Sequence, residues 1–121
     1  MSASRRELGQ RGEQLAAAYL QRNGYTIVTT NWRCAHGELD IVARKDHVLV
    51  FIEVRTRRAS STEEALESVK PHKQIRLQQL AYAYLSANNL PDAAWRVDII
   101  AVALPYRGQP VIEHVENALE W

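Results

Sequence analysis

Two carboxylates of this 121-residue chain, those of Asp40 and Glu53, are predicted to stand opposite each other in a β-hairpin. Residues 38–44 and 48–55 are rich in β-branched and aliphatic side chains, which is typical of strands. A two-residue loop at residues 46–47 joins them and sets the register so that Asp40 faces Glu53. Directly opposed side chains have Cβ atoms about 4.5–5.5 Å apart, so two like charges would repel each other here.

The two faces of this hairpin support the predicted register. One face is wholly apolar, because it collects the side chains of Leu39, Ile41, Ala43, Val50, Ile52 and Val54. The other face carries both acids, and a shared divalent cation would relieve their repulsion. Carboxylate oxygens suit Mg²⁺ or Mn²⁺. In a purely structural alternative, Arg55 bridges Glu38 and Glu53 at a wet sheet surface while Asp40 is solvated.

A third acid, Glu13, lies in a segment that is predicted to be helical. Residues 5–22 place leucines and alanines at helical spacing, and Asn23 with Gly24 is typical of a helix end. Glu13 shares its stripe with small and apolar side chains, namely Ala16, Ala17 and Leu20. Either Glu13 reaches water at the edge of the helix, or it faces the same acidic cluster.

The composition restricts the class of protein. A content of 46% hydrophobic and 24% charged residues is typical of a globular protein, and 121 residues predict a single domain over residues 1–121. The apolar runs are too short to span a bilayer, no apolar segment follows the N-terminus, and Cys34 has no second cysteine to pair with. We therefore expect a cytoplasmic protein without a membrane partner. The net charge is +4 through Arg58 and −3 after it, which is compatible with a polyanionic partner for the first half.

The remaining elements predict the fold class. We expect strands at residues 25–30, 95–104 and 111–115, a short helix opened by a capping box at residues 61–64, and a longer helix from Pro71 to about Ala87. The order αβββααβ(β) predicts an α/β fold with a mixed central sheet flanked by helices. Arg96 and Asp98 share one face of their strand, so we expect a structural ion pair between them.

Three short motifs follow one another along the chain. They are Gly12-Glu13 in the first helix, Gly37-Glu-Leu-Asp-Ile-Val42, and Phe51-Ile-Glu-Val-Arg-Thr-Arg57. With these motifs the chain resembles the bacterial YraN-type family of small uncharacterised proteins, and the match covers nearly the whole sequence. That family is similar to archaeal Holliday junction resolvases within the restriction-endonuclease-like, or PD-(D/E)xK, superfamily. The resemblance implies a restriction-endonuclease-like αβββαβ core and a Mg²⁺-dependent nuclease site.

The resemblance also implies roles for individual residues. Asp40 and Glu53 would be metal ligands, and the backbone carbonyl of Val54 would be a further ligand. Glu13 would be the acid of the first helix that assists the metal or its water. Arg55 occupies the position of the superfamily's lysine, where a cation stabilises charge in the transition state.

Arginine at position 55 departs from the superfamily pattern. Lysine can lose a proton and act as a base, whereas arginine stays charged, so we do not expect Arg55 to be a general base. Lys73 is our candidate surrogate, because it shares a helical stripe with Leu77, Leu80 and Tyr84. Lys70 lies one turn earlier. In the alternative, both are solvated lysines at the N-terminus of their helix.

Four residues are candidates for contact with nucleic acid. Arg57 and Arg58 directly follow Arg55, and phosphate contacts dominate nucleic-acid affinity. Lys70 and His36, which precedes the acidic strand, complete the set. The alternative for each is an exposed loop or surface position.

We therefore expect a divalent-metal-dependent DNA endonuclease with Mg²⁺ or Mn²⁺ as cofactor. The family resemblance implies phosphodiester hydrolysis in branched, Holliday-junction-like DNA by a homodimer. The competing hypothesis, motivated by Arg55, is a catalytically weak or inactive nuclease-fold module that binds nucleic acid or a protein partner. The sequence does not distinguish DNA from RNA.

Overall fold

The computed structural model describes residues 4–69 and 71–120, with the side chains of residues 71–73 and 120 outside that description. The elements in chain order are α1 (Arg5–Arg22), β1 (Thr26–Cys34), β2 (Gly37–Lys45), β3 (Val48–Arg57), α2 (Glu63–Glu67), α3 (Pro71–Ala87), β4 (Trp95–Ala103), β5 (Val111–Val115) and the 3₁₀ helix η1 (Ala118–Glu120). The predicted bounds of α1, α3 and β5 are confirmed, whereas β1 extends to Cys34 instead of ending at Thr30.

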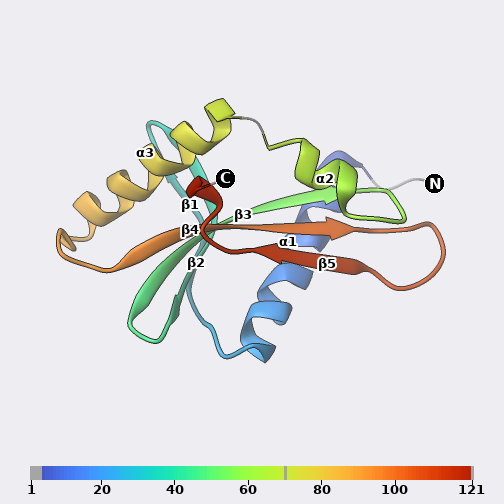
Figure 1. The fold of residues 1–121 in the computed structure, drawn as a ribbon, viewed down its shortest axis with the longest axis horizontal. Coiled ribbons are helices and arrows are strands. Elements are labelled where there is room, and N and C mark those ends of the chain that lie inside the picture. The colour runs from blue at the N-terminus through green and yellow to red at the C-terminus, as the bar shows by residue number, and fades with distance from the viewer. Residues whose placement is uncertain (1–3, 70, 121) are drawn as a thin grey trace.

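The five strands form one mixed sheet in the order β1-β2-β3-β4-β5. Neighbouring strands are antiparallel except β3 and β4, which are parallel from Leu49–Trp95 to Arg57–Ala103. A parallel pair needs a crossover connection, and α2 and α3 supply it. Helices flank the sheet, with α1 and α3 on opposite faces (Figure 1). The predicted mixed α/β fold is confirmed.

Each face of the sheet has its own hydrophobic core. The core under α3 is built around Phe51, Leu80 and Ile99, and the core under α1 around Leu20, Ile52 and Ile100. Alternation along β3 and β4 sends successive side chains to opposite cores, which is why these central strands are apolar on both faces.

The predicted hairpin register is confirmed from Ile41–Ile52 to Lys45–Val48. Leu39, however, packs in the core under α3, whereas Ile41 and Ala43 pack under α1. The prediction that all three share one face was therefore wrong at Leu39. Among the described residues the pairing of β2 with β3 does not continue past Ile41–Ile52. The side chains of β2 before Ile41 therefore need not point to the same faces of the sheet as a regular pairing with β3 would require.

The N-termini of α1 and α2 differ in how they are capped. At α1, the hydroxyl of Ser4 accepts a hydrogen bond from the N–H of Glu7 at 3.1 Å. At α2, the N-cap is Thr62 and not Ser61, and Thr62 makes no capping hydrogen bond, so the predicted capping box of residues 61–64 is wrong. Its hydroxyl donates instead to Glu113 of β5 at 3.1 Å, a tertiary contact that replaces the local one.

The expected ion pair between Arg96 and Asp98 is confirmed, with Nε 3.1 Å from Oδ1. Asp98 is fully buried and also accepts hydrogen bonds from the Nε2 of His114 at 2.7 Å and the N–H of Asn117 at 3.1 Å. The Tyr19 hydroxyl lies 3.2 Å from the Nδ1 of His114. This network, defined by Asp98 and its partners, ties α1 to β4 and β5.

Within the described part of the chain, every helix is too short or too polar to cross a lipid bilayer.

Candidate active site

Asp40 lies where β2 separates from β3. Its Oδ2 accepts a hydrogen bond of 2.8 Å from the backbone N–H of Val54, so a side chain takes the place of a ladder partner at this point. Asp40 and Glu53 were predicted to form a cross-strand pair; they do not, because the pairing ends at Ile41–Ile52. The two carboxylates nevertheless interact electrostatically across the opening between the strands.

α1 brings Glu13 to the same place through the glycine that precedes it. Gly12 is buried against Thr56 of β3, and a Cβ at position 12 would overlap the Thr56 side chain. The helix can therefore approach β3 closely, and Glu13 comes within range of Glu53 and Glu38. Of the two alternatives for Glu13, the structure supports the one in which it faces the acidic cluster.

Glu38 is a fourth acid of this cluster, which the sequence reasoning did not place in the site. The amide nitrogen of Asn31, with its side chain in the orientation that satisfies both groups, donates to Glu38 Oε1 at 2.7 Å and Glu13 Oε2 at 3.3 Å. Asn31 has a φ of 52° and no ladder partner in β2, between the pairs formed by Thr30 and Trp32. Asparagine tolerates this left-handed conformation better than most residues. An asparagine at this position was therefore the feature of the sequence that could have indicated the irregularity.

The acids, defined from here on as the carboxylate cluster of Glu13, Glu38, Asp40 and Glu53, perturb one another. Burial, followed by repulsion from Glu53, raises the pKa of Asp40 to about 7, and the hydrogen bond from Val54 opposes this only in part. Burial and the charges of Glu38 and Glu53 also raise the pKa of Glu13. The cluster thus concentrates negative charge in a partly desolvated place.

Arginines border the carboxylate cluster on two sides. The Nε of Arg55 lies 3.7 Å from Glu53 Oε1, which is an ion pair but too long for a hydrogen bond. That Nε is buried and has no hydrogen-bond partner within residues 4–69 and 71–120. The structural alternative, in which Arg55 bridges Glu38 and Glu53, is therefore only half met, since Glu38 pairs with Arg33 at 3.3 Å.

Arg76 of α3 is the second bordering cation, and the sequence reasoning missed it. Its guanidinium fills the space beside Gly37, where an added Cβ would lie 2.6 Å from a terminal nitrogen of Arg76. Gly37 has a φ of +134°, a backbone conformation that favours glycine. Arg76 lies three residues beyond Lys73, so the helical spacing that singled out Lys73 also pointed here.

A cleft of about 580 Å³ is lined by three members of the carboxylate cluster, all but Glu38. Its lining includes six of the predicted site residues, which are Glu13, Asp40, Glu53, Val54, Arg55 and Arg57. α1 and α2 contribute Arg5 and Glu64 to the walls. A smaller cavity of about 100 Å³ on the α3 side joins Glu38, Asp40 and Glu53 to Arg76.

The other predicted residues lie apart from this cleft or outside the description. His36 is exposed in the turn between β1 and β2. Arg58 donates to the carbonyls of Leu104 and Pro105 and does not line the cleft. Lys70 lies outside the described residues, and of Lys73 only its place in α3 is described.

The carboxylate cluster fits a hydrated divalent cation better than a closed metal cage. Among the described residues, no group of three His, Cys, Asp or Glu side chains is arranged to hold a metal ion. Mg²⁺ commonly uses only one or two carboxylates and completes its shell with water and substrate phosphate oxygens. Asp40 and Glu53 both line the cleft and could supply two such ligands.

Comparison with known proteins places the chain in a family. The model of the uncharacterised protein family UPF0102 matches residues 12–102, which include the whole carboxylate cluster. This chain belongs to family UPF0102. A UPF0102 protein of Roseiflexus castenholzii is 48% identical over 122 residues, covering 99% of this chain and 98% of the relative.

Two further UPF0102 relatives are similar over most of their length. One, from Chloroflexus aurantiacus, is 50% identical over 115 residues, covering 94% of this chain and 92% of the relative. Another, from Geobacter sulfurreducens, is 45% identical over 113 residues, covering 93% of this chain and 88% of the relative. The UPF0102 model thus confirms the YraN-type resemblance at the level of the family, and the description of that family names no activity.

Proposed function

We propose that this UPF0102 chain is a divalent-metal-dependent endonuclease that hydrolyses phosphodiester bonds in DNA. The observation that carries the proposal is a cleft lined by three acids of the carboxylate cluster and by arginines, in which the pKa of Asp40 is raised to about 7. Proteins rarely bury several carboxylates together without a cation to neutralise them. The arginines at the rim suit a phosphate backbone.

The residues of the cleft divide the work in this proposal. Asp40, Glu53 and the carbonyl of Val54 would hold Mg²⁺ or Mn²⁺, which when bound polarises the scissile phosphate and lowers the pKa of an attacking water. Glu13, whose own pKa is raised, would accept a hydrogen bond from that water and orient it. Asn31 keeps the Glu13 carboxylate in place through its amide nitrogen, 3.3 Å away.

Arginine side chains would stabilise the negative charge that develops on the phosphate oxygens in the transition state. Arg55 stands beside Glu53, with its Nε 3.7 Å from Glu53 Oε1, and its side chain lines the cleft, so it would lie close to a phosphate that enters there. Arg76 approaches the same acids from α3. Neither can be a general base, so the proposal assigns both to charge stabilisation.

The proposed shape of the substrate and the proposed oligomeric state of the protein rest on the family resemblance. Branched DNA, of the kind a Holliday junction presents, is the proposed substrate, and a homodimer the proposed assembly. The restriction-endonuclease-like superfamily is the proposed relationship for the αβββαβ core. A cytoplasmic location and a single domain over residues 1–121 complete the proposal.

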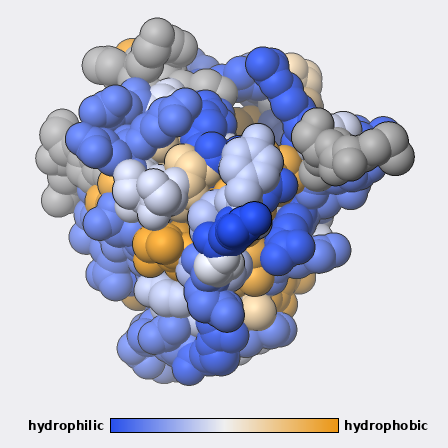
Figure 2. All heavy atoms as spheres, turned by 90° about the vertical axis from the view of Figure 1, so that its right-hand side faces the viewer, coloured by the Kyte–Doolittle hydropathy of each residue, from blue (hydrophilic) through white to orange (hydrophobic). Residues whose placement is uncertain are grey.

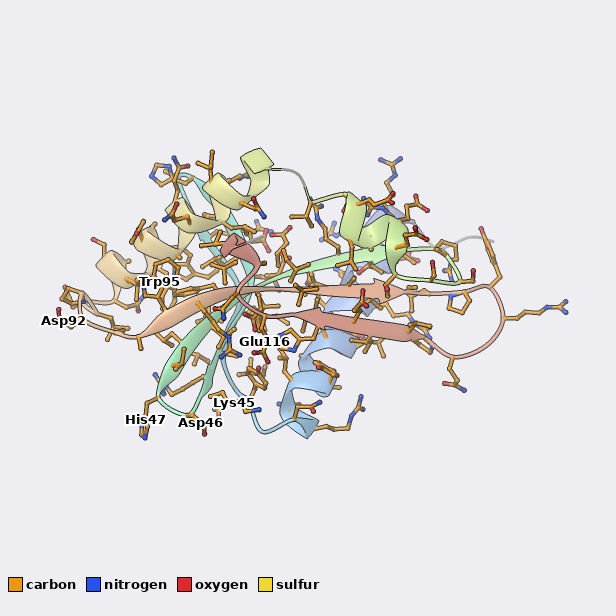
Figure 3. All side chains as sticks on the ribbon, viewed as in Figure 1. Lys45, Asp46, His47, Asp92, Trp95 and Glu116 are labelled. Carbon is orange, nitrogen blue, oxygen red and sulfur yellow. The ribbon has the colours of Figure 1, made fainter. Side chains whose placement is uncertain are left out.

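The test is cleavage of a fluorescent four-way junction and its matched linear duplex with Mg²⁺, Mn²⁺ or EDTA. Asp40→Asn retains the shape and the acceptor for the Val54 N–H, so its effect reports the lost charge. We expect Asp40→Asn and Glu53→Gln each to lower the cleavage rate by about 100-fold or more. Asp46→Asn is the matched control, because Asp46 lies in the turn at the far end of the same hairpin (Figure 3).

Calorimetric titration of Mn²⁺ into the parent and these variants accompanies the assay. Saturable binding that disappears in Asp40→Asn and persists in Asp46→Asn supports the proposed ligands. Parent-like cleavage by Asp40→Asn and Glu53→Gln would overturn the proposal.

A second candidate function is nucleic-acid binding without cleavage, and Arg55 favours it. Its guanidinium replaces a lysine and is held against Glu53 with a side chain only 18% exposed. Arg55→Lys separates the two candidates. A gain of Mg²⁺-dependent cleavage would show that the acids are competent and arginine limits the reaction. Metal-independent binding by both forms, without cleavage, would support the second candidate.

A further inference from the structure

Tyr106 is the most exposed large hydrophobic side chain of the described residues, at 83%. It lies in the loop of residues 104–110 between β4 and β5, which projects from the right-hand end of the sheet in Figure 1. Tyr25 and Tyr84, by contrast, are only 5% and 6% exposed. Packing within the protein therefore does not explain the aromatic ring of Tyr106.

The ring of Tyr106 is held from one side by Arg58. The guanidinium carbon of Arg58 lies 5.1 Å from the ring centroid, in a cation–π arrangement. One nitrogen of the same guanidinium donates to the carbonyls of Leu104 at 3.3 Å and Pro105 at 3.4 Å. The N–H of Leu104 donates in turn to the carbonyl of Arg57 at 2.9 Å. One ring face is thus backed by a fixed cation, and the other remains available to a ligand.

This ring lies at the end of the molecule toward which β3 leads from the carboxylate cluster. Arg57, which lines the cleft, is four residues beyond Glu53, or about 13 Å along a strand. Arg58 comes next, and Arg107 follows Tyr106. The end that carries the loop is largely hydrophilic with smaller apolar areas (Figure 2). An aromatic face among arginines, a few nucleotide lengths from the acids, is typical of proteins that bind single strands.

We propose that Tyr106, backed by Arg58, is a stacking platform for an unpaired base of the nucleic acid that enters the cleft. A base inside a duplex has both faces covered by its neighbours, so the platform selects substrates with unpaired bases, such as a single strand, a flap or an open branch point. Arg58 then acts as a positioning residue for the loop rather than as the simple phosphate contact predicted from sequence. This inference rests on the proposed nucleic-acid substrate.

The test measures binding apart from cleavage, by fluorescence anisotropy of the full chain in EDTA. The probes are a labelled single strand, the same strand in a duplex, and a duplex with a single-stranded flap. Tyr106→Ala should weaken binding of the single strand and the flap by about 5- to 100-fold, since stacking on one aromatic side chain contributes that much. Binding of the duplex should change by less than about twofold, and Tyr106→Trp should restore the affinity.

The control variant is Tyr82→Ala. Tyr82 is also exposed, at 54%, but its ring lies 5.4 Å from Trp95, at the end of the molecule opposite the loop of residues 104–110 (Figures 1 and 3). Arg58→Ala should reproduce part of the Tyr106→Ala loss, because the ring loses its backing.

Parent-like affinity of Tyr106→Ala, an equal loss on duplex and single strand, or the same loss in Tyr82→Ala would overturn the platform. Absence of binding of every probe by the parent would overturn it as well. The proposed nuclease is judged separately, by Mg²⁺-dependent cleavage and its loss in Glu53→Gln. A chain that cleaves normally with Tyr106→Ala on flap substrates retains that function and loses the platform.

Discussion

Asp98 and Asp40 are carboxylates of one sheet, the first fully buried and the second half-buried, and their surroundings are opposite. Asp98 is fully buried and receives hydrogen bonds from Arg96, His114 and the backbone of Asn117. Among the described residues, Asp40 receives a hydrogen bond from the backbone of Val54 and lies among three other carboxylates. The protein thus supplies partners around one acid and repulsion around the other.

The difference separates a structural carboxylate from a binding one. A buried ion that is paired and hydrogen-bonded holds neighbouring elements in place, and here it joins β4 to β5. A buried ion among like charges costs stability in the folded protein, unless a cation or a proton neutralises it. We therefore expect the same substitution, aspartate to asparagine, to change the free energy of unfolding in opposite directions at the two positions.

The largest expected effect is that of Asp98→Asn. The amide of asparagine carries no charge to neutralise Arg96. Its NH₂ group is a donor and would face other donors, whose hydrogen bonds the carboxylate accepts in the parent. We expect the free energy of unfolding to fall by about 3 kcal/mol, as when one partner of a buried ion pair is removed. Urea unfolding at pH 7 measures it. A loss below about 0.5 kcal/mol would mean that the network does not stabilise the fold.

Asp40→Asn should have the opposite sign. The pKa of Asp40 is raised from 3.8 to about 7 in the folded protein, so its contribution to stability is present below pH 4 and is lost as pH rises through 7. Asparagine has no charge to lose. The variant should therefore gain on the parent between pH 4 and pH 8, by on the order of 2 kcal/mol, in urea unfolding without divalent metal. A difference independent of pH would contradict the cause assigned to the raised pKa.

The smallest expected effect is stabilisation by the proposed metal. At a Mg²⁺ concentration ten times the dissociation constant, linkage predicts a gain of about 1.4 kcal/mol for the parent at pH 8. Asp40→Asn should gain much less, whereas Asp46→Asn should match the parent. Thermal unfolding with Mg²⁺ or EDTA measures the gain. Equal gains in the parent and Asp40→Asn would place the cation elsewhere.

Most of the fold followed from local pattern. α1 and α3 were predicted with the observed bounds, because apolar side chains at helical spacing and clear end signals specify a helix without tertiary contacts. The hairpin register was also predictable from Ile41 to Val48, since a one-residue slip would have exposed the apolar face. The three candidate acids, Glu13, Asp40 and Glu53, line one cleft.

What failed were expectations that extended local rules past the point where tertiary contacts compete with them. A capping box at residues 61–64 was expected to open α2, but the N-cap is Thr62, whose hydroxyl donates to the distant carboxylate of Glu113 in β5. Asp40 was expected to pair with Glu53 across a regular ladder, but its side chain takes the N–H of Val54 instead. Leu39 consequently packs under α3 rather than under α1.

The residue types and their order along the chain were enough to predict helices, strands and which acids to examine, because those depend on periodicity and on chemistry within a few residues. Only the tertiary structure decided which charges share a space. The approach of α1 over Gly12, the contact of Arg76 with Gly37 and the hydrogen bonds of His114 and Asn117 to Asp98 all join residues far apart in sequence. Electrostatic free energy depends on distance and burial, and neither is written in the spacing of residues along the chain.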